Sequence, residues 1–283
     1  MATIQDFNGV NPTWCSGCGN HGIGIALKLA LTQMNLDPSQ IAMVFGIGCS
    51  GNMADFINVY ALHSLHGRAI PNAIGIKLAN HKLPVFVIAG DGDTYGEGGN
   101  HFLHACRGNH DIKLITHCNS LYGLTTGQTA PTSQKGFRSK STPEGSVEIA
   151  LNPLIIALYS GATFIAQAYA GDTPQIIEIL KKGIEHKGFV LINILQPCVT
   201  FNKINTYQYY KDKVYKLPAD YDKTNFDEAI KKANELSAER YPLGVIYETN
   251  KPTFTDQLSQ LQEKALIDKE RFTDFSDLIK EFI

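Results

Sequence analysis

The stretch VFVIAGDGDTYGEGGNHFLHACRGNHDIKLITHCNSLYGLTTGQ, from Val85 to Gln128, decides the fold. Its first five residues, 85–89, form an apolar run with the length of a buried strand. The turn Gly90-Asp91-Gly92 follows, then a segment that predicts a helix from Thr94 to Asn109. A second strand is predicted from Ile112 to His117. This order of strand, turn, helix and strand predicts a βαβ unit of a parallel sheet.

Two polar residues follow the two strands of this unit, and both are typical metal ligands. Asp91 comes directly after the first strand, and Asn119 comes directly after the second. The carboxyl edge of an open parallel sheet is where ligands bind. Carboxylate and amide oxygens suit Mg²⁺, which also bridges phosphates, and glycines let backbone N–H groups approach a diphosphate. The alternative is an ordinary turn with a capping Asp and Asn, but the whole unit favours a ligand site.

Composition describes a globular chain and excludes two classes of partner. Hydrophobic residues make up 43% and charged residues 18% of the 283 residues, and the net charge of −2 gives no basic field for nucleic acid. No apolar run is long enough to span a membrane, and no signal peptide is recognised, so we expect a cytoplasmic protein. In that compartment the six cysteines are expected in a metal site, in catalysis or in the core rather than in disulfides.

The remaining chain alternates predicted strands and helices, which implies an α/β fold with a mainly parallel sheet covered by helices on both faces. We expect residues 1–200 to form the ligand-binding domain. The composition changes after Thr200, and residues 201–283 are expected to form a C-terminal arm that packs on the domain or on a partner. The predicted strands are 41–45, 162–168, 190–195 and an edge strand at 243–247. The predicted helices are 22–34, 53–65, 69–80, 151–160, 174–186, 226–236 and 258–267.

Four cysteines are candidates for one metal site. Cys15 and Cys18 form a Cys-x-x-Cys pair in a glycine-rich loop, for which a redox pair, a zinc site and an iron–sulfur site are the three alternatives. Cys49 and Cys198 each follow a predicted strand and are expected at the same sheet edge. Four thiolates beside a diphosphate suit a [4Fe–4S] cluster. Cys106 and Cys118 are expected to be core residues.

Three further segments add candidates for the ligand site. Gly46 to Gly51 matches the dinucleotide pattern G-x-G-x-x-G, but no acid lies between Asn58 and Asn80 to hold a ribose, so NAD is a minor alternative. His66 is either structural or touches the phosphate or ring of the ligand. The loop 124–145 follows the proposed site and is expected to cover it. Its Thr125, Thr126, Thr132 and Ser133 are candidates for substrate contacts, with plain solvation as the alternative.

Several motifs in order resemble the β subunit of 2-oxoacid:ferredoxin oxidoreductases. They are WCSGCGNHG at 14–22, GIGCSGN at 46–52, HGR at 66–68, GDGDTYGEGGNHF at 90–102, LYGLTTGQTAPTS at 121–133 and QPCVTFN at 196–202. The stretch from Gly90 to Asn119 also resembles the thiamine diphosphate signature, except that Cys118 stands where the first of two asparagines is usual. The resemblance covers Asn11 to Asn202 and is weak over the arm.

The resemblance implies a thiamine diphosphate-binding fold and a set of ligand residues. Cys15, Cys18, Cys49 and Cys198 would hold the [4Fe–4S] cluster. Asp91, Asn119 and the carbonyl of Leu121 would hold Mg²⁺. The thiamine diphosphate site would be lined by Ile47, Gly48, Cys49, Ser50, His66, Gly90, Gly92, Asp93, Gly123 and Leu124.

The implied activity is coenzyme A-dependent oxidative decarboxylation of a 2-oxoacid, with electrons passing through the cluster to ferredoxin. No residue of these motifs suits the glutamate that activates thiamine diphosphate, since Glu97 lies near the metal end. An α subunit, or a fused γα subunit, is expected to supply it, so this chain alone is expected to be inactive. Asn52, Leu124 and Thr125 are expected to face the substrate, and the neutral Asn52 leaves pyruvate and 2-oxoglutarate both open. A non-redox thiamine diphosphate decarboxylase or synthase, an NAD-dependent dehydrogenase and a non-enzymatic iron–sulfur scaffold are the alternatives.

Overall fold

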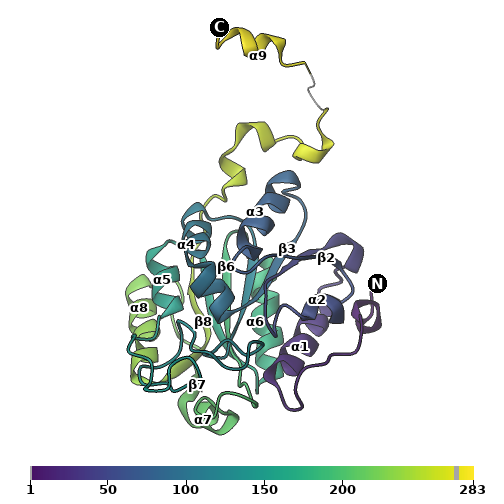
Figure 1. Cartoon of the computed structure of the whole chain (residues 1–283). Coiled ribbons are helices and arrows are strands. Elements are labelled where there is room, and N and C mark those ends of the chain that lie inside the picture. Colours follow the sequence, from purple (N-terminus) through teal and green to yellow (C-terminus); the bar gives the residue numbers. More distant parts are fainter. Residues whose placement is uncertain (1, 271–273) are drawn as a thin grey trace.

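An eight-stranded sheet forms the centre of the computed structural model, which describes residues 2–270 and 274–283 (Figure 1). Its strand order is β2-β1-β3-β4-β6-β5-β8-β7, and the first six strands in the chain run parallel. β8 is antiparallel to β5 and parallel to β7. The strands are β1 (Ala42–Phe45), β2 (Tyr60–His63), β3 (Val85–Gly90), β4 (Lys113–Cys118), β5 (Phe164–Tyr169), β6 (Val190–Leu195), β7 (Val214–Lys216) and β8 (Tyr241–Glu248).

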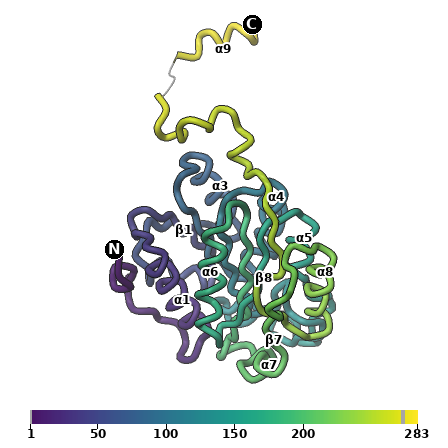
Figure 2. The backbone as a smooth tube through the Cα atoms, turned by 180° about the vertical axis from the view of Figure 1, so that it is seen from behind, coloured from purple at the N-terminus to yellow at the C-terminus, as the bar shows by residue number. Residues whose placement is uncertain are grey.

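Helices cover both faces of this sheet, as the alternation in the sequence predicts (Figures 1 and 2). One face carries α1 (Gly19–Gln33) and α6 (Thr173–Glu185). The other carries α3 (Ala69–Ala79), α4 (Gly99–Gly108), α5 (Pro153–Tyr159) and α8 (Phe226–Asn234). Three shorter helices are α2 (Met53–Phe56), α7 (Tyr207–Lys213) and α9 (Ser276–Lys280). The α/β class and the mainly parallel sheet are confirmed.

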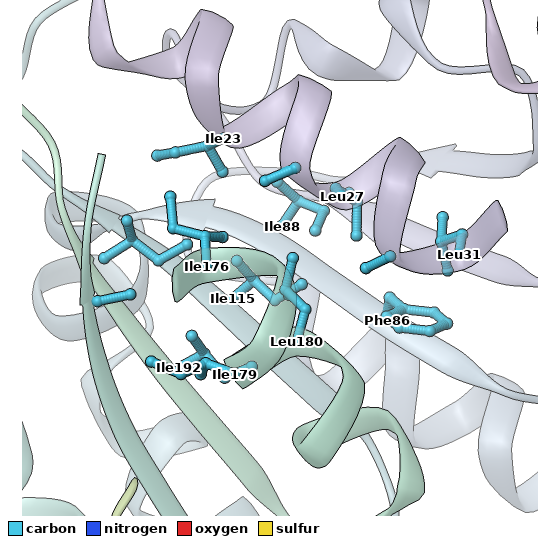
Figure 3. Packing of buried hydrophobic residues seen from close by; sticks show 14 of the residues in the cluster. Ile23, Leu27, Leu31, Phe86, Ile88, Ile115, Ile176, Ile179, Leu180 and Ile192 are labelled. Carbon is cyan, nitrogen blue, oxygen red and sulfur yellow. The ribbon is translucent and has the colours of Figure 1, made fainter. Parts of the chain in front are cut away.

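The central strands β1, β3, β4, β5 and β6 are buried on both faces by the two helix layers, which makes them nearly continuous apolar runs in the sequence. Along β3, Phe86 and Ile88 face α1 and α6, while Val85 and Val87 face the other helix layer. Figure 3 shows the first of these layers. There Ile23, Leu27 and Leu31 of α1 and Ile176, Ile179 and Leu180 of α6 pack above Phe86, Ile88, Ile115 and Ile192 of the sheet.

Three element predictions are wrong, each for a physical reason. The segment 53–65 is one short helix followed by β2, whose four residues are all exposed at the sheet edge, so no burial pattern marks the strand. The segment 258–267 contains only 3₁₀ turns at Ser259–Leu261 and Leu266–Asp268, because little of it packs on the body. β8 is not an edge strand, since β7 pairs along its outer side.

The C-terminal arm leaves the sheet at the end opposite the carboxyl edge, and α9 projects away from the body (Figures 1 and 2). Asp268 of the arm lies 3.9 Å from Lys82, in the loop between α3 and β3. Leu278, Ile279 and Phe282 are exposed. β7 and β8 belong to the main sheet, so the part after residue 200 contributes to the body before it becomes an arm. Within the described residues, no helix has both the length and the apolar character needed to cross a bilayer.

A buried charge cluster at the amino edge of β4 gives a stability prediction. The Asp111 carboxylate lies 2.7 Å from the amino groups of both Lys77 and Lys113. Burial raises the pKa of Asp111, but the attraction of the two lysines outweighs it and lowers the pKa to about 2. Because the folded pKa lies below the ordinary value of 3.8, the stabilisation is present above about pH 4 and disappears as the pH falls through about 2.

We expect Asp111→Asn to lower the free energy of unfolding by about 3–5 kcal/mol at pH 7, because two buried lysines lose their carboxylate. The deficit relative to wild type should shrink between pH 4 and pH 2, as the wild-type carboxyl is protonated. Urea unfolding across this pH range measures it. Glu228→Gln, which breaks an exposed pair with Lys231, is the control and should change stability by less than about 1 kcal/mol. A deficit that persists unchanged at pH 2 would contradict the electrostatic cause.

Candidate active site

A cavity opens at the carboxyl edge of the sheet, where the loops after β1, β3 and β4 meet. This is the point where the chain turns from β1 outward to β2 and then returns to β3, the kind of position where open α/β sheets bind ligands. The cavity is lined by Ile47, Gly48, Cys49, Ser50, His66, Gly90, Asp91, Gly92, Asp93, Asn119, Leu121, Tyr122, Gly123, Leu124 and Thr125. The structure therefore brings together every residue expected for the diphosphate and Mg²⁺ sites, from four separate segments.

Asp91 is a buried carboxylate with hydrogen-bond donors on one oxygen. It is 1% exposed, and its Oδ2 accepts from the backbone N–H of Ser120 at 2.8 Å and from the Thr132 hydroxyl. Burial raises the pKa of this carboxyl. A buried carboxylate with no cationic side chain among its hydrogen-bond partners is costly unless a cation binds beside it. The chemistry of Asp91 therefore fits a divalent metal.

Asn119 also lines the cavity, and hydrogen bonds hold both the oxygen and the nitrogen of its side-chain amide. Its Oδ1 accepts from the N–H of Leu121 at 3.2 Å, and its Nδ2 donates to Gln196 Oε1 at 2.9 Å. The backbone carbonyl of Asn119 accepts from Asn202 Nδ2 at 2.9 Å. The side chain is thus fixed at the cavity wall, with its oxygen beside the Leu121 segment.

Asp93 joins two of the loops that line the cavity. Its Oδ1 accepts from the N–H of Gly67 at 2.8 Å and of Ile47 at 3.3 Å, and lies 3.0 Å from His66 Nδ1. The carboxylate thus connects the loop after β1 with the loop after β2 and orients the His66 ring. Ser50 Oγ is buried at the same wall and has no hydrogen-bond partner among the residues that the structure describes. An unpartnered buried hydroxyl in a cavity of backbone amides fits a polar ligand such as a diphosphate.

Gly92 allows the closest approach across the cavity. A Cβ at this position would collide with the ring of Tyr122. Overpacking costs about 1–3 kcal/mol, so we expect Gly92→Ala to weaken thiamine diphosphate binding roughly 10- to 100-fold, measured by titration calorimetry.

The control for this substitution is Gly99→Ala at the start of α4, where a Cβ meets no atom within 4 Å. It should leave the affinity unchanged and stabilise the helix slightly. Equal affinities of the Gly92 and Gly99 variants would show that the ring of Tyr122 gives way and does not define the cavity.

The four candidate cluster cysteines interact with one another, and one of them, Cys49, lines this cavity. All six cysteines of the chain are free thiols. Burial, with the neighbouring thiols of Cys198 and Cys15, raises the pKa of Cys18 to about 11. Burial and the same group of thiols raise the pKa of Cys49 to about 11 as well. A positively charged iron centre would relieve this repulsion between thiolates, so the donor set fits a cluster.

Trp14 connects two of the three loops that carry these cysteines. Its indole Nε1 donates to the Cys49 carbonyl at 2.6 Å, and its ring packs edge-on against His21 and Phe56. In the described part of the chain, no group of three or more His, Cys, Asp or Glu side chains is arranged around a point that would hold a single metal ion. In a four-iron cluster each thiolate binds a different iron, so its ligands do not converge on one point.

Some predicted residues lie outside the cavity, and others were not foreseen. Asn52 does not line it, whereas Leu124 and Thr125 do. Thr132 reaches Asp91, and Ser133 Oγ donates to the Ser120 carbonyl at 2.7 Å, so these two hydroxyls tie the loop 124–145 to the site. Tyr122 was missed because an aromatic residue between Leu121 and Gly123 carries no chemical signature of its own.

Cys118 is buried in the position that an asparagine usually takes, and Cys106 is buried in α4. Cys118 Sγ lies 3.8 Å from Asp91 Oδ2. Burial raises the pKa of Cys118 well above its usual value, so the thiol is protonated and acts as a weak donor to that carboxylate. The core placement predicted for both cysteines is confirmed.

Comparison with protein families places two known families along the chain. The model described as "Thiamine pyrophosphate enzyme, C-terminal TPP binding domain" matches residues 46–194. The model for the C-terminal part of the pyruvate ferredoxin oxidoreductase beta subunit matches residues 198–263. The first match contains the whole cavity described above, and the second begins at Cys198.

Individual relatives match over nearly the whole length. The 2-oxoacid:ferredoxin oxidoreductase subunit beta of Saccharolobus solfataricus is 40% identical, with 95% of each chain covered. The 2-oxoglutarate synthase subunit KorB of Methanocaldococcus jannaschii is 35% identical, with 89% of this chain and 93% of the relative covered. A solved structure, the 2-oxoglutarate:ferredoxin oxidoreductase from Magnetococcus marinus with 2-oxoglutarate, coenzyme A and succinyl-CoA bound, superimposes with a TM-score of 0.91. It is 36% identical, and the match covers 99% of this chain and 96% of that one.

Proposed function

The chain belongs to the family of 2-oxoacid:ferredoxin oxidoreductase β subunits, and from this premise we propose that it holds thiamine diphosphate, Mg²⁺ and a [4Fe–4S] cluster at the carboxyl edge of its sheet. The reaction we propose is coenzyme A-dependent oxidative decarboxylation of pyruvate, 2-oxoglutarate or both, with ferredoxin as the electron acceptor. The observation that carries the proposal is that Cys49 lines the same cavity as Asp91 and Asn119. One cavity thus joins the metal-diphosphate residues to the cysteine group.

In this proposal Asp91, Asn119 and the carbonyl of Leu121 bind Mg²⁺, which would clamp the diphosphate. Thiamine diphosphate, when bound, supplies an electron sink for the decarboxylation. The protein's own part is to position and to enclose. Asp93 accepts hydrogen bonds from Ile47 and Gly67 and so holds their two loops together. It also contacts the ring of His66, which lines the cavity. The buried Ser50 hydroxyl offers a hydrogen bond to the diphosphate.

Cys15, Cys18, Cys49 and Cys198 are the proposed cluster ligands. Cys18 directly precedes α1 and Cys198 follows β6, so helix and strand ends of the rigid body position both thiols. Cys49 lines the thiamine diphosphate cavity and also belongs to this group, so electrons leaving the cavity have a short route to the cluster.

In this proposal the site is completed by a partner subunit. Among the described residues, no glutamate lines the cavity. An α subunit, or a fused γα subunit, would bring the glutamate that activates the cofactor, so the isolated chain would have no turnover. We further propose that residues 1–200 carry both cofactors and that the arm, the part of residues 201–283 that follows β8, packs on the partner. Leu278 and Ile279 of α9, and Phe282 just after it, are exposed apolar side chains, which suits such a contact.

The substrate class follows from the wall of the cavity. Leu124 and Thr125 are neutral and line the same cavity as Cys49, and no lysine or arginine among the described residues lines it to select a second carboxylate. The lysines and the arginine of the loop 124–145 are the remaining source of positive charge. The ratio of kcat/KM for pyruvate to that for 2-oxoglutarate, measured with the assembled complex, decides between the two acids. A cytoplasmic location is proposed because free cysteines suit a reducing compartment.

The test is the visible and EPR spectrum of the complex purified without oxygen. We expect brown protein with a [4Fe–4S] signal that dithionite reduces and that changes when 2-oxoacid and coenzyme A are added. The isolated chain should carry the cluster but show no turnover. A colourless protein with one equivalent of zinc, or turnover by the isolated chain, would contradict the proposal.

A further inference from the structure

We propose that Gln196 is a positioning residue that connects the two cofactor sites and raises the reduction potential of the cluster. This inference rests on the proposed function, because it assigns a role toward the cluster and the metal. Gln196 directly follows β6 and is 1% exposed. Its side chain reaches a predicted ligand of each cofactor, Cys18 on one side and Asn119 on the other.

The amide of Gln196 uses both of its polar atoms. Its Nε2 donates to Cys18 Sγ at 3.4 Å and to the Pro197 carbonyl at 2.7 Å, and its Oε1 accepts from Asn119 Nδ2 at 2.9 Å. A Cβ on Gly19 would lie 2.9 Å from Gln196 Cγ, so only a glycine after Cys18 lets the amide approach the thiol. The backbone N–H of Gln196 donates to the Cys118 carbonyl at 2.8 Å, which anchors the residue to β4.

The bond to Cys18 affects the cluster through charge. A reduced cluster carries one more negative charge than an oxidised one, and part of that charge resides on the thiolate sulfurs. An N–H group directed at a sulfur stabilises the reduced form and so raises the potential. Gln196 is uncharged and buried, so its dipole acts where water does not screen it.

The bond to Asn119 affects the metal through orientation. Because Gln196 Oε1 accepts from Asn119 Nδ2, the oxygen of Asn119 is left to face the Leu121 segment, where the proposed metal would bind. Residues that orient a metal ligand in this way typically change metal affinity by about 10- to 100-fold when removed. One side chain therefore sets the geometry at the metal and the electrostatics at the cluster.

Two substitutions separate these effects in the complex with its partner subunit. Gln196→Met keeps the length of the side chain but loses the hydrogen bonds to Cys18 and Asn119. Gln196→Glu keeps an oxygen for Asn119 and loses the donor to Cys18. The matched control is Gln167→Met on β5, because Gln167 is also buried and also uses both amide atoms, donating to the Pro242 carbonyl and accepting from Asn193.

EPR-monitored redox titration gives the midpoint potential, and calorimetry gives the Mg²⁺-dependent affinity for thiamine diphosphate. We expect both Gln196 variants to lower the potential by about 60 mV or more, the one-electron equivalent of a tenfold change in the ratio of reduced to oxidised cluster. Only Gln196→Met should also weaken the cofactor affinity, by roughly 10-fold or more. Gln167→Met should change neither quantity.

An unchanged potential in both Gln196 variants, or an equal fall in Gln167→Met, would overturn the inference. Weakened affinity in Gln196→Glu equal to that in Gln196→Met would overturn the separate role toward Asn119. These results require a wild-type complex that shows the [4Fe–4S] signal. A wild-type complex without that signal would instead contradict the proposed function, so the two failures are distinguishable.

Discussion

Asp91→Asn will weaken Mg²⁺-dependent binding of thiamine diphosphate by at least about 100-fold. The reason is that mutating even a residue that only orients a metal ligand typically lowers metal affinity by about 10- to 100-fold. The substitution keeps the size of the side chain and its ability to accept from Ser120 and Thr132. It removes the charge and replaces the second carboxylate oxygen by an NH₂ group, and Mg²⁺ requires both the charge and the oxygen. Calorimetric titration of the complex with thiamine diphosphate, with and without Mg²⁺, measures the effect.

The same substitution should not destabilise the cofactor-free chain. Asp91 is 1% exposed, and burial raises the pKa of its carboxyl, so the charged form costs free energy when no cation is bound. We therefore expect the cofactor-free Asp91→Asn chain to unfold at the same temperature as wild type or higher, and to gain nothing when Mg²⁺ and thiamine diphosphate are added. The unfolding temperature of wild type should rise strongly when Mg²⁺ and thiamine diphosphate are added.

The control is Asp111→Asn, which removes a buried carboxylate at the opposite edge of the sheet. It should lower the stability and leave the cofactor affinity unchanged. Asp91→Asn should therefore lower the cofactor affinity but not the stability, whereas Asp111→Asn should lower the stability but not the cofactor affinity. If Asp91→Asn binds the cofactor normally with Mg²⁺, Asp91 is not the metal ligand.

The residues at the strand ends were predictable from the sequence because parallel strands bring their carboxyl ends to one edge. Once β3 and β4 are recognised as buried apolar runs, Asp91 and Asn119 must lie near each other, whatever the details of the fold. The same reasoning places Cys49 after β1 and Cys198 after β6. The apolar pattern of the strands and the position of each residue after a strand were sufficient to predict where these residues lie.

Other features depend on tertiary contacts that leave no local pattern. β2 was missed because Tyr60 to His63 are all exposed, and an exposed edge strand has no alternation of apolar and polar residues. The bridge made by Gln196 was not foreseen because it joins residues 77 and 178 positions away, and a glutamine after a strand has many possible roles. Nothing in the sequence around Asp93 indicated that its carboxylate connects the loops at Ile47 and Gly67.

Cys198→Ala will abolish the [4Fe–4S] cluster, with iron content falling to less than about one tenth of the wild-type value, because a cluster of this kind takes four cysteine thiolates. Cys198 follows β6 on the loop that also holds Gln196, so its thiol is positioned by the sheet rather than by a mobile segment. Iron and sulfide analysis of the complex, purified without oxygen, measures the loss. Oxidation of the 2-oxoacid with ferredoxin should disappear with it.

Cys106→Ala is the matched control, since Cys106 is also a free cysteine but is buried in the helix α4. It should keep its iron and lose about 1 kcal/mol of stability through the small cavity it leaves. Thiamine diphosphate binding should survive in Cys198→Ala, because Asp91 and Asn119 do not depend on the cluster. A Cys198→Ala complex that retains the full iron content would remove Cys198 from the ligand set. Joint loss of iron and cofactor would mean that the two sites fold as one unit, as the bridge from Cys18 through Gln196 to Asn119 makes possible.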